Sequence, residues 1–250
     1  MPPDPPPVDV SPAAARPRSR RAFATWAAAG LAGLGGWKWL RSRDADDDLP
    51  WPLRQVHRFN ERLGRALFSD THLAPEFPPG TAREPKQNGR HGRPAEGVAP
   101  VIVRVEQPGL APRMIAPADL VAGLPRVEMT TELKCIEGWS QVVTWGGVRF
   151  ADFAAALGTD AGRHPFVSMG TADGAYYVGL DTASAMHPQT LLCDRMNGET
   201  LPEAHGGPLR LVSAVKYGIK NIKWVGRISF RDDRPADFWA EQGYDWYAGL

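Results

Sequence analysis

The chain is poor in cysteine and has almost no net charge. Its 250 residues include two cysteines, Cys135 and Cys193, which excludes a disulfide framework and allows a single bridge at most. The formal charge of +1 gives no overall field of the kind that nucleic-acid-binding proteins show. CxxC, HExxH and P-loop motifs are also missing from the sequence. The chain therefore carries no motif for a common zinc site or nucleotide-phosphate site.

Glycine and proline are abundant, with 26 and 24 residues, a fifth of the chain together. This composition favours short strands joined by many turns over a helix bundle. Hydrophobic residues make up 43%, an ordinary value for a folded protein. We therefore predict that residues 49–250 form a single α+β domain, β-dominated, with mixed sheets and short peripheral helices.

Residues 1–48 are expected to lie outside this domain. A Pro-rich head, predicted to be disordered, leads to several arginines, and the apolar run Ala22–Leu40 and the acidic run Asp44–Asp48 follow. This order is typical of a secretory signal, and residues 19–23 (SRRAF) resemble a bacterial twin-arginine export signal. An uncleaved membrane anchor is the alternative. Both place the domain in the periplasm or on the outer face of the cytoplasmic membrane.

Hydrophobic spacing predicts the elements of the domain. A short amphipathic helix is expected within residues 49–68, and the Pro- and Gly-rich segment 69–97 reads as a long loop, either functional or disordered. Strands are expected at 98–107, 126–135, 141–150, 165–171, 175–180, 191–196, 209–215 and 224–230, and short helices at 116–124, 151–157 and 182–186. We predict a turn at Gly146-Gly147 within the third strand segment, and an aromatic C-terminal tail that packs against the domain.

Cys135 lies in the stretch TTELKCIEGWS. Alternate residues from Val127 onward are apolar or small, while Glu128, Glu132 and their neighbours of the same parity are polar, which predicts a strand with one inward face that ends at Cys135. The pattern alone leaves four interpretations of this thiol: core packing, a disulfide with Cys193, a nucleophile or a metal ligand. For Cys193, on a predicted strand, core packing is expected.

Two stretches carry a family resemblance: LKCIEGWSQVVTWGGVRFADFAAALG and LPEAHGGPLRLVSAVKYGIKNIKW. Together they resemble the sulfite-oxidase-type molybdopterin-binding domain, and within it the bacterial exported branch of protein-methionine-sulfoxide reductase catalytic subunits. The resemblance implies that fold, a molybdopterin cofactor, and Cys135 as the catalytic molybdenum ligand. A thiolate is a soft ligand that suits such a metal, and coordination would deprotonate it.

The resemblance also implies which residues bind the pterin and its phosphate. Glycines allow close backbone approach, and Arg and Lys supply positive charge for a phosphate. The implied cofactor-binding residues are Asn60, Thr171, His205, Arg210, Gly218, Ile219 and Lys220. His205 stands where the methionine-sulfoxide branch has Asn, and Asn60 is preferred over a second set of candidates, which comprises His72, Arg83, Asn88 and His91.

The resemblance implies a molybdopterin-dependent oxidoreductase that transfers oxygen atoms in two-electron steps and, by analogy with that branch of the family, reduces S-oxides such as methionine sulfoxide. A membrane cytochrome or a quinone-linked protein is the expected electron partner, and nucleic acid is not. Residues 136–139 (IEGW) occupy the place where sulfite oxidases have arginines, so a sulfite pocket is not expected. The alternatives are oxidation of a small sulfur compound with electron transfer to a cytochrome, a cofactor-free binding module, or a thiol-redox protein that uses Cys135 and Cys193.

Overall fold

The computed structural model describes residues 12–46, 49–95, 102–158 and 161–250, so the Pro-rich head lies outside the described residues. The chain divides into two units, Met1–Leu53 and Arg54–Leu250. The first unit contains the helix α1 (Pro12–Arg41). From Arg20 onward, the residues at most positions of this helix are exposed. Within the described ranges, no helix combines the length and apolarity that a membrane crossing requires.

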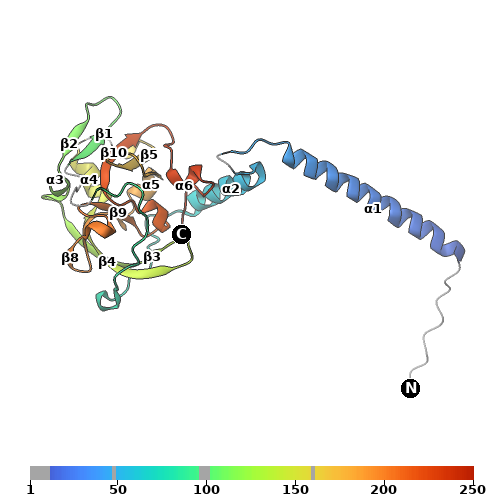
Figure 1. Ribbon diagram of the computed structural model, residues 1–250, viewed down its shortest axis with the longest axis horizontal. Coiled ribbons are helices and arrows are strands. Elements are labelled where there is room, and N and C mark those ends of the chain that lie inside the picture. The colour runs from blue at the N-terminus through green and yellow to red at the C-terminus, as the bar shows by residue number, and fades with distance from the viewer. Residues whose placement is uncertain (1–11, 47–48, 96–101, 159–160) are drawn as a thin grey trace, which may run out of the picture. The chain divides into compact units, whose positions relative to one another are not determined.

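The second unit follows as a series of short strands and helices (Figure 1). The prediction of a β-dominated α+β body is confirmed. The helices are α2 (Trp51–Leu67), α3 (Pro117–Val121), α4 (Phe150–Ala156), α5 (Thr182–Ala185) and α6 (Phe238–Glu241), with 3-10 turns η1 (Pro79–Thr81), η2 (Ala161–Arg163), η3 (Glu203–His205) and η4 (Gly218–Lys220). The strands are β1 (Val103–Glu106), β2 (Arg113–Ile115), β3 (Arg126–Lys134), β4 (Ser140–Arg149), β5 (Phe166–Thr171), β6 (Tyr177–Asp181), β7 (Thr190–Met196), β8 (Glu199–Thr200), β9 (Arg210–Ser213) and β10 (Val225–Arg231).

The strands form two five-stranded sheets. The first has the order β2-β1-β10-β5-β6, in which β1 and β10 run parallel and the other neighbours antiparallel. The second has the order β3-β4-β7-β8, with β9 paired to β7. Apolar side chains of both sheets and of α4 pack into one core. Side chains alternate between the two faces of a strand, so Leu192 of β7 reaches this core while Leu191 and Cys193 belong to a second cluster.

The predicted turn at Gly146-Gly147 is wrong. β4 runs through both glycines, and its register against β7 shifts between them, which is a β-bulge. A Cβ on Gly147 would lie 2.0 Å from the carbonyl oxygen of Leu192. The glycine pair therefore serves a close approach between neighbouring strands and not a reversal of the chain.

The two cysteines are free, so the bridge considered above is not formed. Cys193 is fully buried, and burial raises the pKa of its thiol to about 12. This supports core packing for Cys193, because a reactive thiol needs a lowered pKa and access to solvent.

The aromatic tail packs against the domain, as predicted, and two buried lysines hold it there. Lys220 is fully buried, and its Nζ donates to Asp237 Oδ2 (2.5 Å) and to the carbonyl oxygen of Gly179 (2.9 Å). Lys216 Nζ donates to the carbonyl oxygen of Tyr247 at 2.8 Å. Asp237 also accepts the N–H of Ala240 and so caps α6. One ion pair thus ties η4, β6 and α6 together.

α2 lies beside α6 (Figure 1), and a polar side chain of α2 joins the two helices. The buried guanidinium of Arg54 donates to the carbonyl oxygen of Ala240 at 3.2 Å. Two helical turns further on, Glu61 accepts two hydrogen bonds from Arg234, at 2.9 and 3.2 Å. Charged groups on the inward face of α2 therefore help to fix the helix to the C-terminal segment.

We expect Asp237→Asn to lower the free energy of unfolding by about 3–5 kcal/mol, because it leaves the Lys220 ammonium buried without a counterion. Chemical denaturation monitored by tryptophan fluorescence measures the change. The control is Asp194→Asn, which breaks the half-exposed pair with Arg126 and should cost no more than about 1 kcal/mol. Equal losses in the two variants would contradict the importance of the buried pair, and the double variant Lys220→Met/Asp237→Leu should recover part of the loss.

Candidate cofactor site

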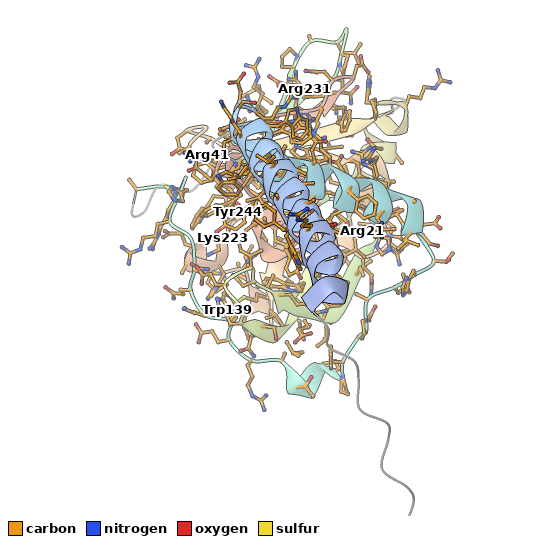
Figure 2. The ribbon with its side chains drawn as sticks, turned by 90° about the vertical axis from the view of Figure 1, so that its right-hand side faces the viewer. Arg21, Arg41, Trp139, Lys223, Arg231 and Tyr244 are labelled. Carbon is orange, nitrogen blue, oxygen red and sulfur yellow. The ribbon has the colours of Figure 1, made fainter. Side chains whose placement is uncertain are left out.

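A cavity of about 240 Å³ opens beside the end of β3. Its walls come from five parts of the chain: the loop at 85–91, residues 133–139, Tyr176, residues 205–224 and the C-terminal segment. Trp139, Lys223 and Tyr244, labelled in Figure 2, all line it. Aromatic rings make up much of the wall, and the polar groups gather on residues 205–224 and around Cys135. A largely apolar cavity with a few convergent polar groups is the usual form of a small-molecule site.

Cys135 lies directly after β3, in a turn that closes onto itself. Its N–H donates to the carbonyl oxygen of Trp139 (2.9 Å), and its own carbonyl oxygen accepts the N–H of Gly138 (3.1 Å). Gly138 has a φ of +86°, a conformation that glycine adopts without strain. The sequence EGW after the cysteine therefore builds a tight turn, which holds the half-buried sulfur at the cavity wall.

The side chain of Asn88 contacts this sulfur. Its Nδ2 lies 3.7 Å from Cys135 Sγ, within range of a weak N–H···S hydrogen bond. The main-chain carbonyl oxygen of Asn88 accepts from Lys223 Nζ at 2.5 Å, so the loop that carries Asn88 is joined to the part of the wall formed by residues 205–224. Beyond the sulfur, the Glu137 carboxylate accepts the indole N–H of Trp139 at 2.9 Å, and this bond and one from Asn88 lower the pKa of Glu137.

Arg210 supplies a buried positive charge to the cavity. Its guanidinium donates to the carbonyl oxygens of His205 (2.8 Å) and Asn221 (3.2 Å) and lies 4.4 Å above the Trp145 ring. In the described part of the chain, Nε finds no hydrogen-bond partner. Burial lowers the pKa of Arg210 to about 10. Because its partners are carbonyl groups, the charge is solvated but not neutralised.

His205 and Lys223 extend this charged group. His205 is buried, and its Nε2 makes no hydrogen bond to the described residues; the nearest carboxylate oxygen, of Glu84, is 3.8 Å away. Burial, followed by the charges of Lys223 and Arg210, lowers the pKa of His205. Burial, with Arg210 and Arg93, lowers the pKa of Lys223 to about 8. Two buried cations close to an imidazole form a site for an anion such as a phosphate.

The η4 turn forms another part of the wall through Gly218 and Ile219. A Cβ on Gly218 would lie 3.3 Å from the carbonyl oxygen of Lys134, so a glycine lets this turn approach the end of β3 closely. The carbonyl oxygen of Ile219 accepts the phenol of Tyr176 at 2.6 Å. Burial raises the pKa of Tyr176 far above its usual value, so this phenol remains a donor.

The structure brings together five of the residues predicted for the site: Cys135, His205, Arg210, Gly218 and Ile219. Three others do not line the cavity in the described residues. Asn60 is exposed on α2, and the Lys220 ammonium is held by Asp237. The buried Thr171 hydroxyl donates to Asp173 at 2.6 Å. Their roles stay predictions, and none of the three side chains is among those of the cavity wall.

Asn88, ranked below Asn60 from the sequence, is the asparagine that reaches Cys135. The signal that pointed to it was the long Pro- and Gly-rich loop, which reads as functional because compact domains seldom keep such loops otherwise. The wall residues Lys86, Trp239 and Tyr244 lay outside the two stretches that carry the family resemblance, and no motif marked them as functional.

Comparison with known proteins gives consistent findings. A family model described as the oxidoreductase molybdopterin binding domain matches residues 98–239. The YedZ1 protein of Azospira oryzae, whose name assigns it provisionally as a protein-methionine-sulfoxide reductase subunit, is 33% identical over 207 residues, which cover 82% of this chain and 78% of that protein.

Two further relatives are catalytic subunits of protein-methionine-sulfoxide reductase, named MsrP. That of Xanthomonas campestris is 34% identical and covers 57% of this chain and 48% of its own length. That of Ralstonia nicotianae is 32% identical and covers 59% and 50%. The chain thus spans about half the length of these two relatives. Among solved structures, the sulfane dehydrogenase SoxCD of Paracoccus pantotrophus matches with a TM-score of 0.49 at 19% identity, over 66% of this chain and 46% of that one.

We expect the cavity to bind a tetrahedral dianion, with an affinity that falls as the pH rises through about 8. Lys223 is cationic below its lowered pKa and neutral above it, so each pH unit above 8 should weaken binding by up to about tenfold. Isothermal titration of the cofactor-free protein with sulfate, whose charge is constant over this range, measures the affinity between pH 7 and 9. The Lys223→Arg variant should bind sulfate with the same affinity at pH 7 and at pH 9. A wild-type affinity that rises with pH would contradict the assignment of Lys223 to the anion site.

Proposed function

The chain belongs to the oxidoreductase molybdopterin-binding domain family, and on this basis we propose that it reduces S-oxides, such as methionine sulfoxide, at a molybdenum held by molybdopterin. It is a molybdenum cofactor-dependent oxidoreductase. The observation that carries the further assignment is the meeting of Cys135 with the anion-binding group in one cavity. When bound, the cofactor supplies the two-electron oxygen-atom chemistry, and the protein positions it and controls access.

The residues of the cavity fit this cofactor. Its phosphate is an anion, and Arg210, Lys223 and His205 offer positive charge together with an N–H or lone pair that has no partner among the described residues. Gly218 and Ile219 present backbone at close range. Cys135 would be the protein's ligand to the metal, because a thiolate on a rigid turn is a soft donor with a fixed direction. Asn88 would orient the sulfur through its amide.

An S-oxide has a polar oxygen between apolar arms, and the cavity offers groups for both. Trp139, Trp239 and Tyr244 line the wall with rings that can pack on the arms and exclude water. Lys86 also lines the wall, with its ammonium 5.9 Å from the Trp139 ring, and would donate to the substrate oxygen. IEGW after the cysteine places a carboxylate where an oxyanion such as sulfite would be repelled. These features and the names of the relatives support S-oxides over sulfite.

Export completes the proposal. The twin-arginine-like segment at residues 19–23 and the apolar run after it support an exported protein, in the periplasm or attached to the outer face of the cytoplasmic membrane. Its electrons would then come from a membrane cytochrome or a quinone-linked protein, since the sequence has no CxxCH motif for a haem of its own.

Protein from a cofactor-competent host should contain about one molybdenum per chain and oxidise reduced viologen when methionine sulfoxide is added. Cys135→Ser should lower this rate by at least about 100-fold, because a metal ligand matters at least as much as the groups that orient it. Cys193→Ala is the matched control and should retain the rate, since that thiol lies in the core. Metal analysis and viologen absorbance give the readouts.

Wild-type protein that contains no molybdenum would contradict the enzymatic assignment and favour a cofactor-free binding module. Protein with molybdenum that oxidises sulfur compounds with cytochrome as acceptor, and does not turn over S-oxides, would reverse the proposed direction of oxygen transfer.

The export proposal has a separate test. Arg20→Lys/Arg21→Lys should keep the protein in the cytoplasm of a bacterial host, while Arg16→Lys/Arg18→Lys, which changes the same number of arginines outside the pair, should leave export intact. Fractionation followed by mass measurement reports the compartment and shows whether the segment is removed. A wild-type protein found only in the cytoplasm would refute the proposal.

A further inference from the structure

The loop at 85–91 places an Asn-Gly dipeptide beside the sulfur of Cys135. The chain has two such dipeptides, Asn88-Gly89 and Asn197-Gly198. In an Asn-Gly pair, the main-chain nitrogen of the glycine can attack the side-chain amide of the asparagine, because glycine has no Cβ to block the approach. The attack requires contact between that nitrogen and the amide carbon, so the fold decides which of the two pairs reacts.

At Asn88 the two reacting groups are in contact. The N–H of Gly89 donates to Asn88 Oδ1 at 2.7 Å. Since a C=O bond is about 1.23 Å long, the amide carbon lies at most about 3.9 Å from this nitrogen. The proton that the nitrogen has to lose points at the amide group, so its loss leaves a lone pair directed at that group. Gly89 is exposed, which gives water and hydroxide access to this peptide group.

The amide of Asn197 is held away from the same reaction. Its Oδ1 accepts the N–H of Thr144 at 3.0 Å, and its Nδ2 donates to the carbonyl oxygen of Arg83 at 3.1 Å. Both hydrogen bonds have to break before this amide can turn toward the nitrogen of Gly198. Within the described residues, the only hydrogen bond to Asn88 Oδ1 comes from the attacking nitrogen itself. The fold therefore favours reaction at Asn88 over reaction at Asn197.

We propose that Asn88 is a site of spontaneous deamidation in the cofactor cavity. The Gly89 nitrogen forms a bond to Cγ of Asn88, and its proton passes through water to the amide nitrogen, which leaves as ammonia. Water then opens the resulting five-membered imide at one of its two carbonyl groups. One opening gives aspartate, and the other gives isoaspartate, in which the main chain runs through Cγ. The reaction consumes one water, releases one ammonia and transfers no electrons.

Both products remove the amide that contacts Cys135 and add a carboxylate. Nδ2, which lies 3.7 Å from Cys135 Sγ, is lost, and an ionised carboxylate cannot donate in its place. The new charge is added beside the Glu137 carboxylate, to which the Asn88 side chain is hydrogen-bonded. Negative charge at this position opposes a thiolate and an anionic ligand. Deamidation would therefore weaken the binding of the cofactor.

Isoaspartate has a further effect on the anion-binding group. The main-chain carbonyl oxygen of Asn88 accepts from Lys223 Nζ, and in isoaspartate this carbonyl becomes the free carboxylate. Lys223 then has a counterion supplied by the protein and is no longer available to neutralise a ligand. The modification itself does not depend on the molybdenum chemistry, so it can be tested in cofactor-free protein.

The first experiment is peptide mapping by mass spectrometry. The full-length, cofactor-free chain is incubated at mildly alkaline pH in water enriched in heavy oxygen, and the product at Asn88 should carry one heavy oxygen from the solvent. Loss of Asn88 should be at least about tenfold faster than loss of Asn197, because both hydrogen bonds of Asn197 have to break first. Asn88→Gln is the control, since the longer side chain keeps an amide but cannot form the five-membered ring. No reaction at Asn88, or equal loss of the two asparagines, overturns the proposal.

The second experiment measures the effect on the cavity by isothermal titration with sulfate. Aged wild-type protein that is rich in isoaspartate should bind sulfate at least about tenfold more weakly than fresh protein, because Lys223 has gained a counterion. Asn88→Gln protein aged in the same way should keep its initial affinity. An aged wild-type protein that binds sulfate as tightly as the fresh protein overturns the effect on the cavity. Neither experiment uses molybdenum, so both outcomes are separate from the test of S-oxide reduction.

Discussion

The buried ammonium of Lys220 is the group on which the shape of the cavity depends. It joins three segments that are distant in sequence, because Asp237 and the carbonyl of Gly179 share it. Gly218 and Ile219 precede it and line the cavity, and Trp239, two residues after Asp237, lines it as well. Since an unpaired buried charge costs several kcal/mol, these segments hold one arrangement. The position of these wall segments therefore depends on the ion pair between Lys220 and Asp237.

The cations inside the cavity have the opposite arrangement. Arg210 and Lys223 are solvated by carbonyl groups, and their pKa values are lowered to about 10 and 8 because burial is not offset by a carboxylate. The buried charge of Lys220, behind the cavity wall, is thus neutralised by a carboxylate of the protein. The charges of Arg210 and Lys223, at the cavity itself, are left for a bound ligand to neutralise. An anionic cofactor that binds only the folded state would also stabilise the fold, so cofactor insertion and stability are coupled.

The positions of the elements followed from the sequence to a large extent, since period-two alternation and turn residues are local signals. β3, the bend after Cys135 and the strands from residue 165 onward lie close to where their patterns predict them. The glycine pair at 146 and 147 misled the prediction because a bulge and a turn both use glycine, and the partner strand decides between them. Asn60 and Asn88 also could not be ranked, because their distance from Cys135 depends on the path of the loop at 69–97.

The sequence by itself determined that Cys135 ends an inward strand face in a glycine turn, and that glycines and cations cluster at residues 205–223, because these are properties of neighbouring residues. The family followed from those two stretches. Only the tertiary structure decided which groups meet: Asn88 reaches a sulfur 47 residues away, and Lys220 turns from the cavity to Asp237. A lysine beside a glycine turn suits a phosphate or a carboxylate equally well, and the choice follows from which anion the packing places within its reach.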